Sequence, residues 1–259
     1  MLTLIQLRHS PYNEKVRWAL DIKNVVHERR SLLPGPHLGT VKALTGRTTT
    51  PVLIADGVAM DGSSRVIRWL EERYPEPKLL PLDPELRSLA LEIERRFDDD
   101  LTPRIRRVVL DTLLRSPGYF AAVFGEGASW PKRFGYACVV PFAAFMVKKG
   151  NGITGPSSLE DGHRAAIEAL DYVAERSSTT GYLAGGIFSI ADLAAASALA
   201  TIVRPVDSPM SSPRPVAAPF QALVDTYSGH AGARWVRRIY KAHRGASHDF
   251  DGPTVASHR

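Results

Sequence analysis

The sequence predicts an α/β domain over residues 1–78, followed by an all-helical domain over residues 84–245. Three observations support this fold class. Short apolar runs alternate with helical patterns before residue 75, whereas long amphipathic helical patterns fill the chain after residue 84. Between them, the segment "PEPKLLPLDPE" holds four prolines in eleven residues, which is typical of a domain boundary. Residues 246–259 have little apolar surface to bury, so we expect them to form a mobile tail.

Composition excludes several classes of protein. The chain has 259 residues, enough for two hydrophobic cores, and a net charge of +6 that is spread along its length. Because the basic residues are not concentrated and no nucleic-acid-binding signature is present, we expect no nucleic-acid partner. The single cysteine, Cys138, excludes an intrachain disulfide, and its apolar surroundings predict a buried side chain.

Neither a signal peptide nor a membrane span is expected. The N-terminal run "LTLIQL" is followed at once by Arg8, which is too short for the apolar core of a signal peptide. The apolar run at residues 136–147 is too short to cross a bilayer. These patterns predict a cytoplasmic protein without a membrane partner.

The first elements form a β–α–β unit. Residues 2–7 predict a strand, and from Asn13 apolar residues recur at helical spacing, with Glu14, Lys15 and Arg17 expected on the surface. Residues 25–33 predict a second strand. A helix joining two strands over so short a distance indicates parallel strands with a right-handed crossover.

The rest of the first domain predicts a hairpin and a helix. A loop with a short helix around residues 40–44 leads to strands at residues 52–55 and 58–60, joined by an Asp-Gly turn. A helix then begins with Ser63 or Ser64 as its N-cap and ends at Pro75.

The second domain predicts long helices. We expect them at residues 84–114, 130–148, 159–176, 190–203 and 220–243, with a proline-rich loop before the last one. Ser189 and Asp192 have the spacing of a capping box, which predicts a structural role at the start of the helix at residues 190–203. The segment "RWVRRIYKAHR" predicts a basic, solvated helix face.

Ser10 lies at the junction of the first strand and helix, in "SPYNEKVRWAL". A serine before a proline is typical of a helix N-cap, which is one interpretation. The same position gathers unpaired N–H groups and partial positive charge that favour an anion, so Ser10 is also a candidate site residue. Its local sequence leaves both roles open.

Together with "TTTPVLI", "MDGSSRVIRWLEE" and "GYLAGGIFSIADLAAASAL", this stretch resembles the cytosolic glutathione transferase superfamily. The resemblance extends to about residue 243. It implies a thioredoxin-like N-terminal domain that binds glutathione as cosubstrate. It also implies a helical domain that holds a hydrophobic small-molecule electrophile, a homodimer and a role in detoxification.

The resemblance assigns roles to the first site residues. It implies that the Ser10 hydroxyl faces the sulfur of glutathione and is catalytic, with Asn13 as the alternative. It also implies that Pro51 follows a cis peptide bond and that the backbone of Thr50 pairs with the cysteinyl part of glutathione. From the residues alone, a trans proline at the start of an edge strand is the alternative.

Two family features are altered in this chain. Ser64 matches the serine that binds the γ-glutamyl carboxylate, but Ser63 replaces the usual Glu or Gln that pairs with the α-amino group. Asp61 is a candidate for the missing charge, and both serines can also cap the helix. The lysine that usually reaches the glycine carboxylate is absent, and three other cations are candidates for its role: Arg47, Lys42 and His37.

Other charged and aromatic residues allow either a structural or a functional interpretation. The acidic run at residues 98–100 indicates solvated charge or interface pairing, and no metal site is expected there. Three arginines that follow the acidic run face either the cleft between the domains or a dimer partner: Arg104, Arg106 and Arg107. Tyr12 and Tyr119 either pack in the core or line a substrate pocket.

The sequence therefore predicts an enzyme that conjugates the glutathione thiolate to an electrophile. Two alternatives remain open. One is a non-catalytic ligand-binding or regulatory protein on the same fold. The altered Ser63 and the absent loop lysine support it, because a protein released from catalysis loses its contacts to glutathione first. The other is a glutathione-dependent isomerase or dehalogenase, since fold alone does not determine the reaction.

Overall fold

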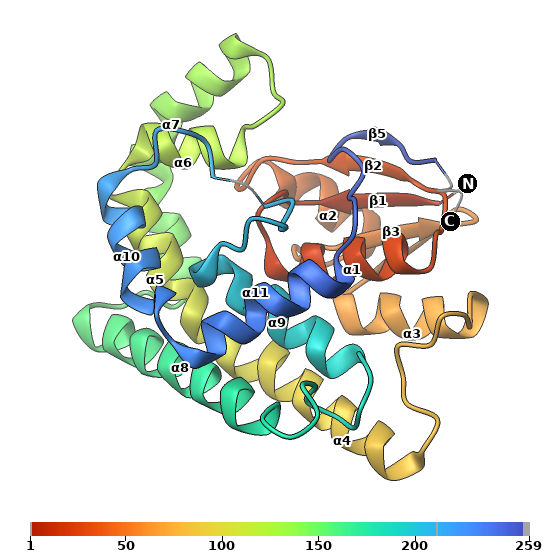
Figure 1. The fold of residues 1–259 in the computed structure, drawn as a ribbon. Helices are drawn as coiled ribbons and strands as arrows, with labels where there is room; N and C mark the ends of the chain where they lie inside the picture. The colour runs from red at the N-terminus through yellow and green to blue at the C-terminus, as the bar shows by residue number, and fades with distance from the viewer. Residues whose placement is uncertain (1, 211, 256–259) are drawn as a thin grey trace.

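The computed structural model describes residues 2–210 and 212–255. It has the predicted fold class, a β-sheet with helices followed by an all-helical region (Figure 1). A five-stranded sheet has the order β4-β3-β1-β2-β5. Its strands are β1 Thr3–Gln6, β2 Glu28–Ser31, β3 Val52–Ala55, β4 Val58–Asp61 and β5 Gly252–Pro253. The pair β1–β2 is parallel and the other pairs are antiparallel, which confirms the predicted β–α–β unit and hairpin.

Helices cover both faces of this sheet because successive strand residues point to opposite sides. Leu4 and Leu53 belong to the main core, which includes residues of α1 (Pro11–Ile22) and α3 (Ser63–Arg73). Ile5 and Val52 form a smaller core with α2 (His37–Thr45). The N-terminal domain is therefore thioredoxin-like, as predicted.

The rest of the chain is helical as far as His243. Its helices are α4 Pro84–Arg95, η1 Arg96–Leu101, α5 Thr102–Leu114, α6 Pro117–Phe124, α7 Trp130–Gly150, α8 Pro156–Arg176, α9 Ile190–Val203, α10 Ala218–Ser228 and α11 Ala231–His243. Every residue of α9 is buried, and this helix packs against α1, α4 and α11. It therefore forms much of the contact between the two domains.

The predicted capping pair opens α9. The Asp192 carboxylate accepts hydrogen bonds from the backbone N–H of Ser189 at 3.0 Å and of Leu183 at 2.9 Å. Burial raises the pKa of Asp192 to about 6, because a charged carboxylate loses its hydration there. The structural interpretation of this pair is confirmed.

Buried ions hold α1 in place, and here the sequence analysis was wrong. Glu14, Lys15 and Arg17 are buried rather than on the surface. Glu14 accepts from Arg17 at 2.9 Å and from Arg244 at 2.7 Å, and Arg244 also lies 3.0 Å from Asp21. Charged residues are rarely buried unless paired, and the partner Arg244 lies so far along the chain that local periodicity could not reveal it.

The end of the chain makes contacts that the sequence analysis did not foresee. Residues 246–255 lie along β2, where the Asp251 carboxylate accepts from the backbone N–H of Ser31 at 2.5 Å, and Gln6 of β1 donates to the backbone oxygen of Phe250 at 2.7 Å. The mobile tail stays a prediction, and residues 256–259 lie outside the described part. The polar and backbone contacts of residues 246–255 were not foreseen, because this segment has few apolar residues.

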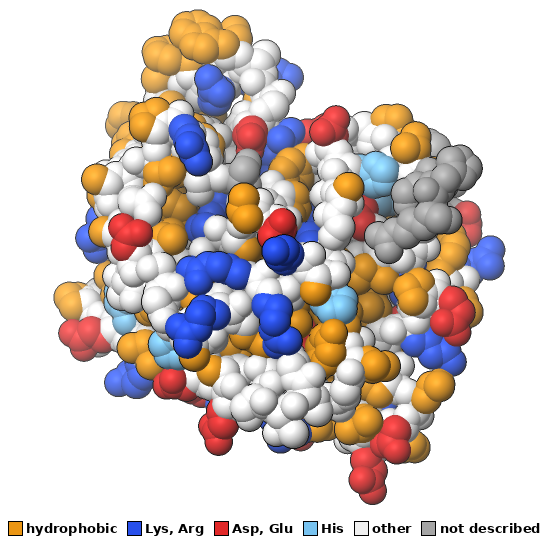
Figure 2. All heavy atoms as spheres, in the orientation of Figure 1, with side chains coloured by type: hydrophobic (Ala, Val, Ile, Leu, Met, Phe, Trp, Pro, Cys, Tyr) orange, Lys and Arg blue, Asp and Glu red, His pale blue; other side chains and the backbone are white. Residues whose placement is uncertain are grey.

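Cys138 is the other correction, because its side chain is exposed on α7 rather than buried. Helix α7 begins in a lobe that projects from the body of the protein, and hydrophobic side chains cover the tip of that lobe (Figures 1 and 2). Across the described residues, no helix combines the length and apolar character that crossing a membrane requires.

His27 is expected to make folding depend on pH. Its Nδ1–H donates to Val25 and its Nε2 accepts from Arg29 at 3.0 Å, while the backbone of the C-terminal segment covers it through Thr254. Burial lowers the pKa of His27 to about 4. Between pH 6.5 and 4 the unfolded chain binds more protons, so the free energy of unfolding falls as the pH falls.

The free energy of unfolding of the wild type falls between pH 7 and pH 4, and we predict that His27→Gln makes this fall smaller by on the order of 3 kcal/mol. The measurement is urea unfolding of both proteins across that range. Parallel pH profiles for the wild type and the variant would contradict the assignment.

Candidate functional site

Three segments that are far apart in the sequence meet beside the start of α1. The Thr50–Pro51 peptide bond is cis, as predicted. The Pro51 carbonyl accepts from the backbone N–H of Gly62 at 3.2 Å, and the Asn13 side-chain amide donates to the Thr50 hydroxyl at 2.9 Å. These bonds connect the start of β3 to the starts of α3 and α1.

Ser10 is the N-cap of α1, but its side chain does not cap. The residue has an extended backbone (φ −87°, ψ 130°), Pro11 follows it, and its hydroxyl makes no hydrogen bond to the first turn. Its backbone carbonyl accepts the first helical bond, from Glu14 at 2.9 Å. The half-buried hydroxyl is therefore available to a ligand at the positive end of the helix.

Asn13, the alternative to Ser10, has a structural role. Its side chain is fully buried, and its amide nitrogen donates to Thr50 as described above. The amide group keeps a second N–H, but the fully buried side chain offers no exposed surface to a ligand. The geometry therefore favours Ser10, and its role toward the sulfur stays a prediction.

A charged cluster that the sequence analysis did not identify lies at the start of α3. The Lys15 ammonium, on α1, lies 2.6 Å from Glu94 and 2.5 Å from Asp98. Ser64 donates to the Asp98 carboxylate at 2.9 Å and accepts from Lys15 at 3.2 Å, and the Ser63 hydroxyl lies 3.5 Å from the same carboxylate. One ammonium, one shared carboxylate and two hydroxyls thus surround the N-terminus of α3.

A change in helix type accompanies Asp98 in this position. Asp98 lies in η1, a π-helical turn in which the N–H of Thr102 bonds to the carbonyl of Phe97, five residues back. The same pattern at the next residue fails because Pro103 has no N–H, so the Asp98 carbonyl is left without its helical donor. The Tyr12 hydroxyl donates to that carbonyl at 2.7 Å, and burial raises the Tyr12 pKa, which keeps the phenol protonated.

The predicted cap of α3 is wrong. The N-cap is Gly62, with φ of 87°, a left-handed conformation that glycine adopts without strain, and neither serine caps the helix. Ser63 and Ser64 occupy the first two helical positions instead, where their hydroxyls point to Asp98. The capping interpretation gave too little weight to glycine.

Asp61 has other partners than those expected. Its carboxylate lies 3.5 Å from Arg47 and 3.7 Å from Arg65. Among the three candidate cations, Arg47 is therefore placed beside the end of β4, whereas His37 accepts from the backbone N–H of Gly35 and Lys42 is exposed. The Asp98 carboxylate lies 3.5 Å from the Ser63 hydroxyl, whereas the Asp61 carboxylate lies beside Arg47 and Arg65.

His9, beside Ser10, is a buried neutral side chain that the sequence analysis missed. Desolvation lowers its pKa to about 4, its ring packs against Phe124, and the Glu126 carboxylate lies 3.6 Å from Nε2. Among the described residues, neither ring nitrogen has a hydrogen-bond partner. His9 is therefore a neutral side chain buried against Phe124 and Phe250.

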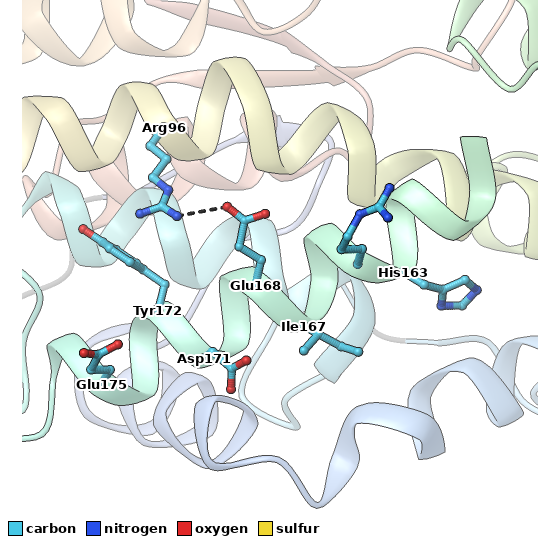
Figure 3. Close-up of a pocket in the computed structure, with 8 residues that line it drawn as sticks. Arg96, His163, Ile167, Glu168, Asp171, Tyr172 and Glu175 are labelled. Atoms are coloured by element: carbon cyan, nitrogen blue, oxygen red, sulfur yellow. Dashed lines mark hydrogen bonds and ion pairs between the residues drawn. The ribbon is translucent and has the colours of Figure 1, made fainter. Parts of the chain in front are cut away.

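A separate shallow pocket lies on η1 and α8, away from the predicted site residues (Figure 3). Arg96 pairs with Glu168 at 3.0 Å and lies over the ring of Tyr172, with 4.3 Å between the guanidinium carbon and the ring centroid. Within the described ranges, no group of three His, Cys, Asp or Glu side chains is arranged to hold a metal ion.

Comparisons with known proteins agree with this architecture. Residues 4–78 match the family described as "Glutathione S-transferase, N-terminal domain". Maleylpyruvate isomerase from Ralstonia sp. is 29% identical over 124 residues, which are 45% of this chain and 57% of that protein. The chain matches about half the length of the curated relatives to which it is similar.

Two solved structures share the fold along most of the chain. A glutathione S-transferase from Rhodospirillum rubrum F11 has a TM-score of 0.61 and 20% identity, covering 95% of this chain and 89% of that one. A glutathione S-transferase from Methylobacterium radiotolerans JCM 2831, in complex with glutathione sulfonate, has a TM-score of 0.53 and 23% identity, covering 91% and 94%. Both span the two domains.

We predict that Asp98→Asn lowers the free energy of unfolding by about 2 kcal/mol, because the buried Lys15 ammonium loses one of its two carboxylates. Asp99→Asn is the matched control, since Asp99 is the exposed neighbour in the same acidic run. It should change stability by less than about 0.5 kcal/mol in urea unfolding. Equal losses in the two variants would contradict the proposed pairing.

Proposed function

Because the chain belongs to the glutathione S-transferase superfamily, we propose that it binds glutathione at the N-termini of α1 and α3. We further propose that it transfers the thiolate to a hydrophobic electrophile held by the helical domain. One observation carries this proposal: the free Ser10 hydroxyl and the charged cluster around Ser64 lie at two helix N-termini joined through Thr50 and Pro51.

The charged cluster fits the γ-glutamyl end of glutathione, which is an amino-acid zwitterion. The first N–H groups of α3 suit its carboxylate, and the buried Lys15 ammonium behind Ser64 adds positive potential there. The Asp98 carboxylate, 3.5 Å from Ser63, suits its ammonium group. Asp98 thus supplies the negative charge that a Glu at the position of Ser63 would provide in the family pattern.

The middle of the peptide fits beside Thr50. In the described part of the chain, the backbone amide and carbonyl of Thr50 make no hydrogen bond. They are therefore free to pair with the cysteinyl unit, as the family resemblance implies. Asn13 fixes the Thr50 side chain from the α1 side, so it positions this backbone without touching the peptide.

Glutathione supplies the reacting thiol, and Ser10 lowers its pKa. The Ser10 hydroxyl donates to the thiolate, and the N–H groups at the start of α1 add positive potential. One pKa unit corresponds to about 1.4 kcal/mol, which is the scale of one charge-assisted hydrogen bond. Holding thiolate and electrophile together supplies the rest of the rate, without a covalent enzyme intermediate.

The same resemblance supports a cytoplasmic homodimer with a role in detoxification. A second candidate activity is glutathione-dependent isomerisation, which the similarity to a maleylpyruvate isomerase favours. A non-catalytic binding or regulatory protein is the third, supported by the altered Ser63 and the absent loop lysine. The first two activities use the glutathione site. A binding or regulatory protein would use the same site for glutathione or for a different ligand.

The function is tested by titrating glutathione into the protein by calorimetry and then assaying conjugation to a generic aryl halide. We expect binding below about millimolar concentration and measurable turnover. Absence of binding at millimolar glutathione would overturn the proposal. Binding without conjugation would support the isomerase or the binding protein, and a cis–trans isomerisation assay would then separate these two.

We predict that Ser10→Ala lowers kcat at least about tenfold, because the thiolate loses a hydrogen bond that the thiol does not need. Ser116→Ala is a matched control, since Ser116 also precedes a proline at a helix start and makes no capping bond. An unchanged kcat in Ser10→Ala, with glutathione still bound, would assign thiolate stabilisation to another group.

We predict that Asp98→Asn weakens glutathione binding at least about tenfold, because the ammonium of the γ-glutamyl group loses its carboxylate partner. Asp61→Asn should leave the affinity nearly unchanged, since Asp61 pairs with Arg47 and Arg65 instead. Calorimetry of both variants decides between the two carboxylates. A larger loss in Asp61→Asn would restore the expectation drawn from the sequence.

A further inference from the structure

Helix α7 exposes a row of large apolar side chains that no described residue covers. The exposed fractions are 86% for Phe142, 69% for Phe145, 68% for Trp130, 66% for Met146 and 58% for Phe134. Isolated exposed apolar residues are ordinary, but a contiguous patch of this kind marks an interaction surface.

These side chains share one face of the helix. At 100° per residue, the five positions fall within one half of the helix surface, and Cys138 and Lys149 lie in the same half. The opposite half holds Val140 and Tyr136, which pack against the core, and the Tyr136 hydroxyl donates to Pro34. The helix is therefore anchored on its inner side, while the five residues named above form an exposed apolar ridge on its outer side. Figure 2 shows hydrophobic side chains gathered at the tip of the projecting lobe.

The charges of α7 are all positive and lie at its two ends. Lys132 and Arg133 are in the first turn, Lys148 and Lys149 are in the last, and the helix contains no acidic residue. Residues 134–147 carry no charged side chain at all. Lys148 is paired with Asp111 at 2.7 Å, and Arg133 lies in the same half of the helix as Val140. Lys132 and Lys149, which have no ion pair among the described residues, are therefore the cations available beside the exposed face.

This charge pattern selects among the possible occupants of the ridge. A second copy of α7 would bring basic ends against basic ends in either a parallel or an antiparallel pairing, which is unfavourable. A negatively charged planar surface with an apolar interior complements the aromatic ridge and its basic ends simultaneously. Aromatic side chains flanked by lysine and arginine are the pattern of helices that lie in the interface of an anionic bilayer.

We propose that α7 docks the protein on the surface of an anionic lipid membrane, with its aromatic ridge inserted among the headgroups and its cations against the lipid phosphates. This is peripheral binding, distinct from the membrane span that the apolar run is too short to form. No membrane partner was expected, because the apolar run is too short to span a bilayer and no signal peptide was found. The apolar surroundings of Cys138 separately predicted a buried side chain, whereas the structure exposes it and several apolar neighbours.

The test is sedimentation with vesicles of phosphatidylcholine and phosphatidylglycerol in equal parts, and with vesicles of phosphatidylcholine alone. We expect binding to the anionic vesicles that weakens as salt is added. Phe142→Ser combined with Phe145→Ser should weaken the partition coefficient by roughly tenfold or more. Leu82→Ser combined with Val206→Ser is the control for lost exposed apolar surface elsewhere, and it should bind normally.

The basic ends are tested separately. Lys132→Glu combined with Lys149→Glu should weaken binding to the anionic vesicles by about tenfold or more, because each substitution replaces an attraction by a repulsion. Lys78→Glu combined with Lys241→Glu makes the same change in net charge at exposed lysines outside α7. Equal losses in the two double variants would show that net charge alone drives binding and would overturn the proposal.

The chain's single cysteine supplies an independent readout. An environment-sensitive fluorophore on Cys138 should shift to the blue with anionic vesicles, while a label on Val206→Cys in a Cys138→Ser background should not. Absence of binding to either vesicle at low salt would overturn the proposal. A shift that appears without vesicles and grows with protein concentration would also overturn it, because a second copy would then cover the ridge.

Discussion

The buried Lys15 ammonium is the constraint around which the candidate site is arranged. An unpaired ammonium in this position would be costly, so Glu94 and Asp98 from the helical domain must approach it. Asp98 in turn accepts from Ser64 at the start of α3, and the Tyr12 hydroxyl donates to the Asp98 carbonyl, which the proline after η1 leaves without a helical donor. One ion cluster therefore joins the two domains and fixes both helix N-termini that we propose as the glutathione site.

Much of the fold could be predicted from local patterns. Strand and helix periodicity, the Asp-Gly turn and the Ser189–Asp192 pair each depend on neighbouring residues, and the structure confirms them. The cis bond before Pro51 came from the family resemblance and is also confirmed. The unforeseen features are contacts between distant residues: Glu14 is buried because Arg244 reaches it, and the C-terminal segment is held by its bonds to β2.

The same distinction between local patterns and distant contacts applies to the candidate site. Ser10, Thr50, Ser63 and Ser64 could be identified because each belongs to a motif that is contiguous in the sequence. Asp98 could not, since three neighbouring acids offer the same chemistry and only the π-helical turn decides which of them faces α3. The exposure of one face of α7 also lay beyond prediction, because an apolar run predicts burial when the elements around it are not known. Its exposed ridge gives the fold a surface that the site does not need.

The central claim is that the start of α1 stabilises the thiolate of bound glutathione through Ser10. The ultraviolet absorbance of that thiolate, followed against pH with the protein in excess, measures it directly. Our account predicts a midpoint at least about one pH unit below that of the free thiol, and a return toward the free value in Ser10→Ala. A bound thiol that titrates at the same pH as free glutathione would contradict it.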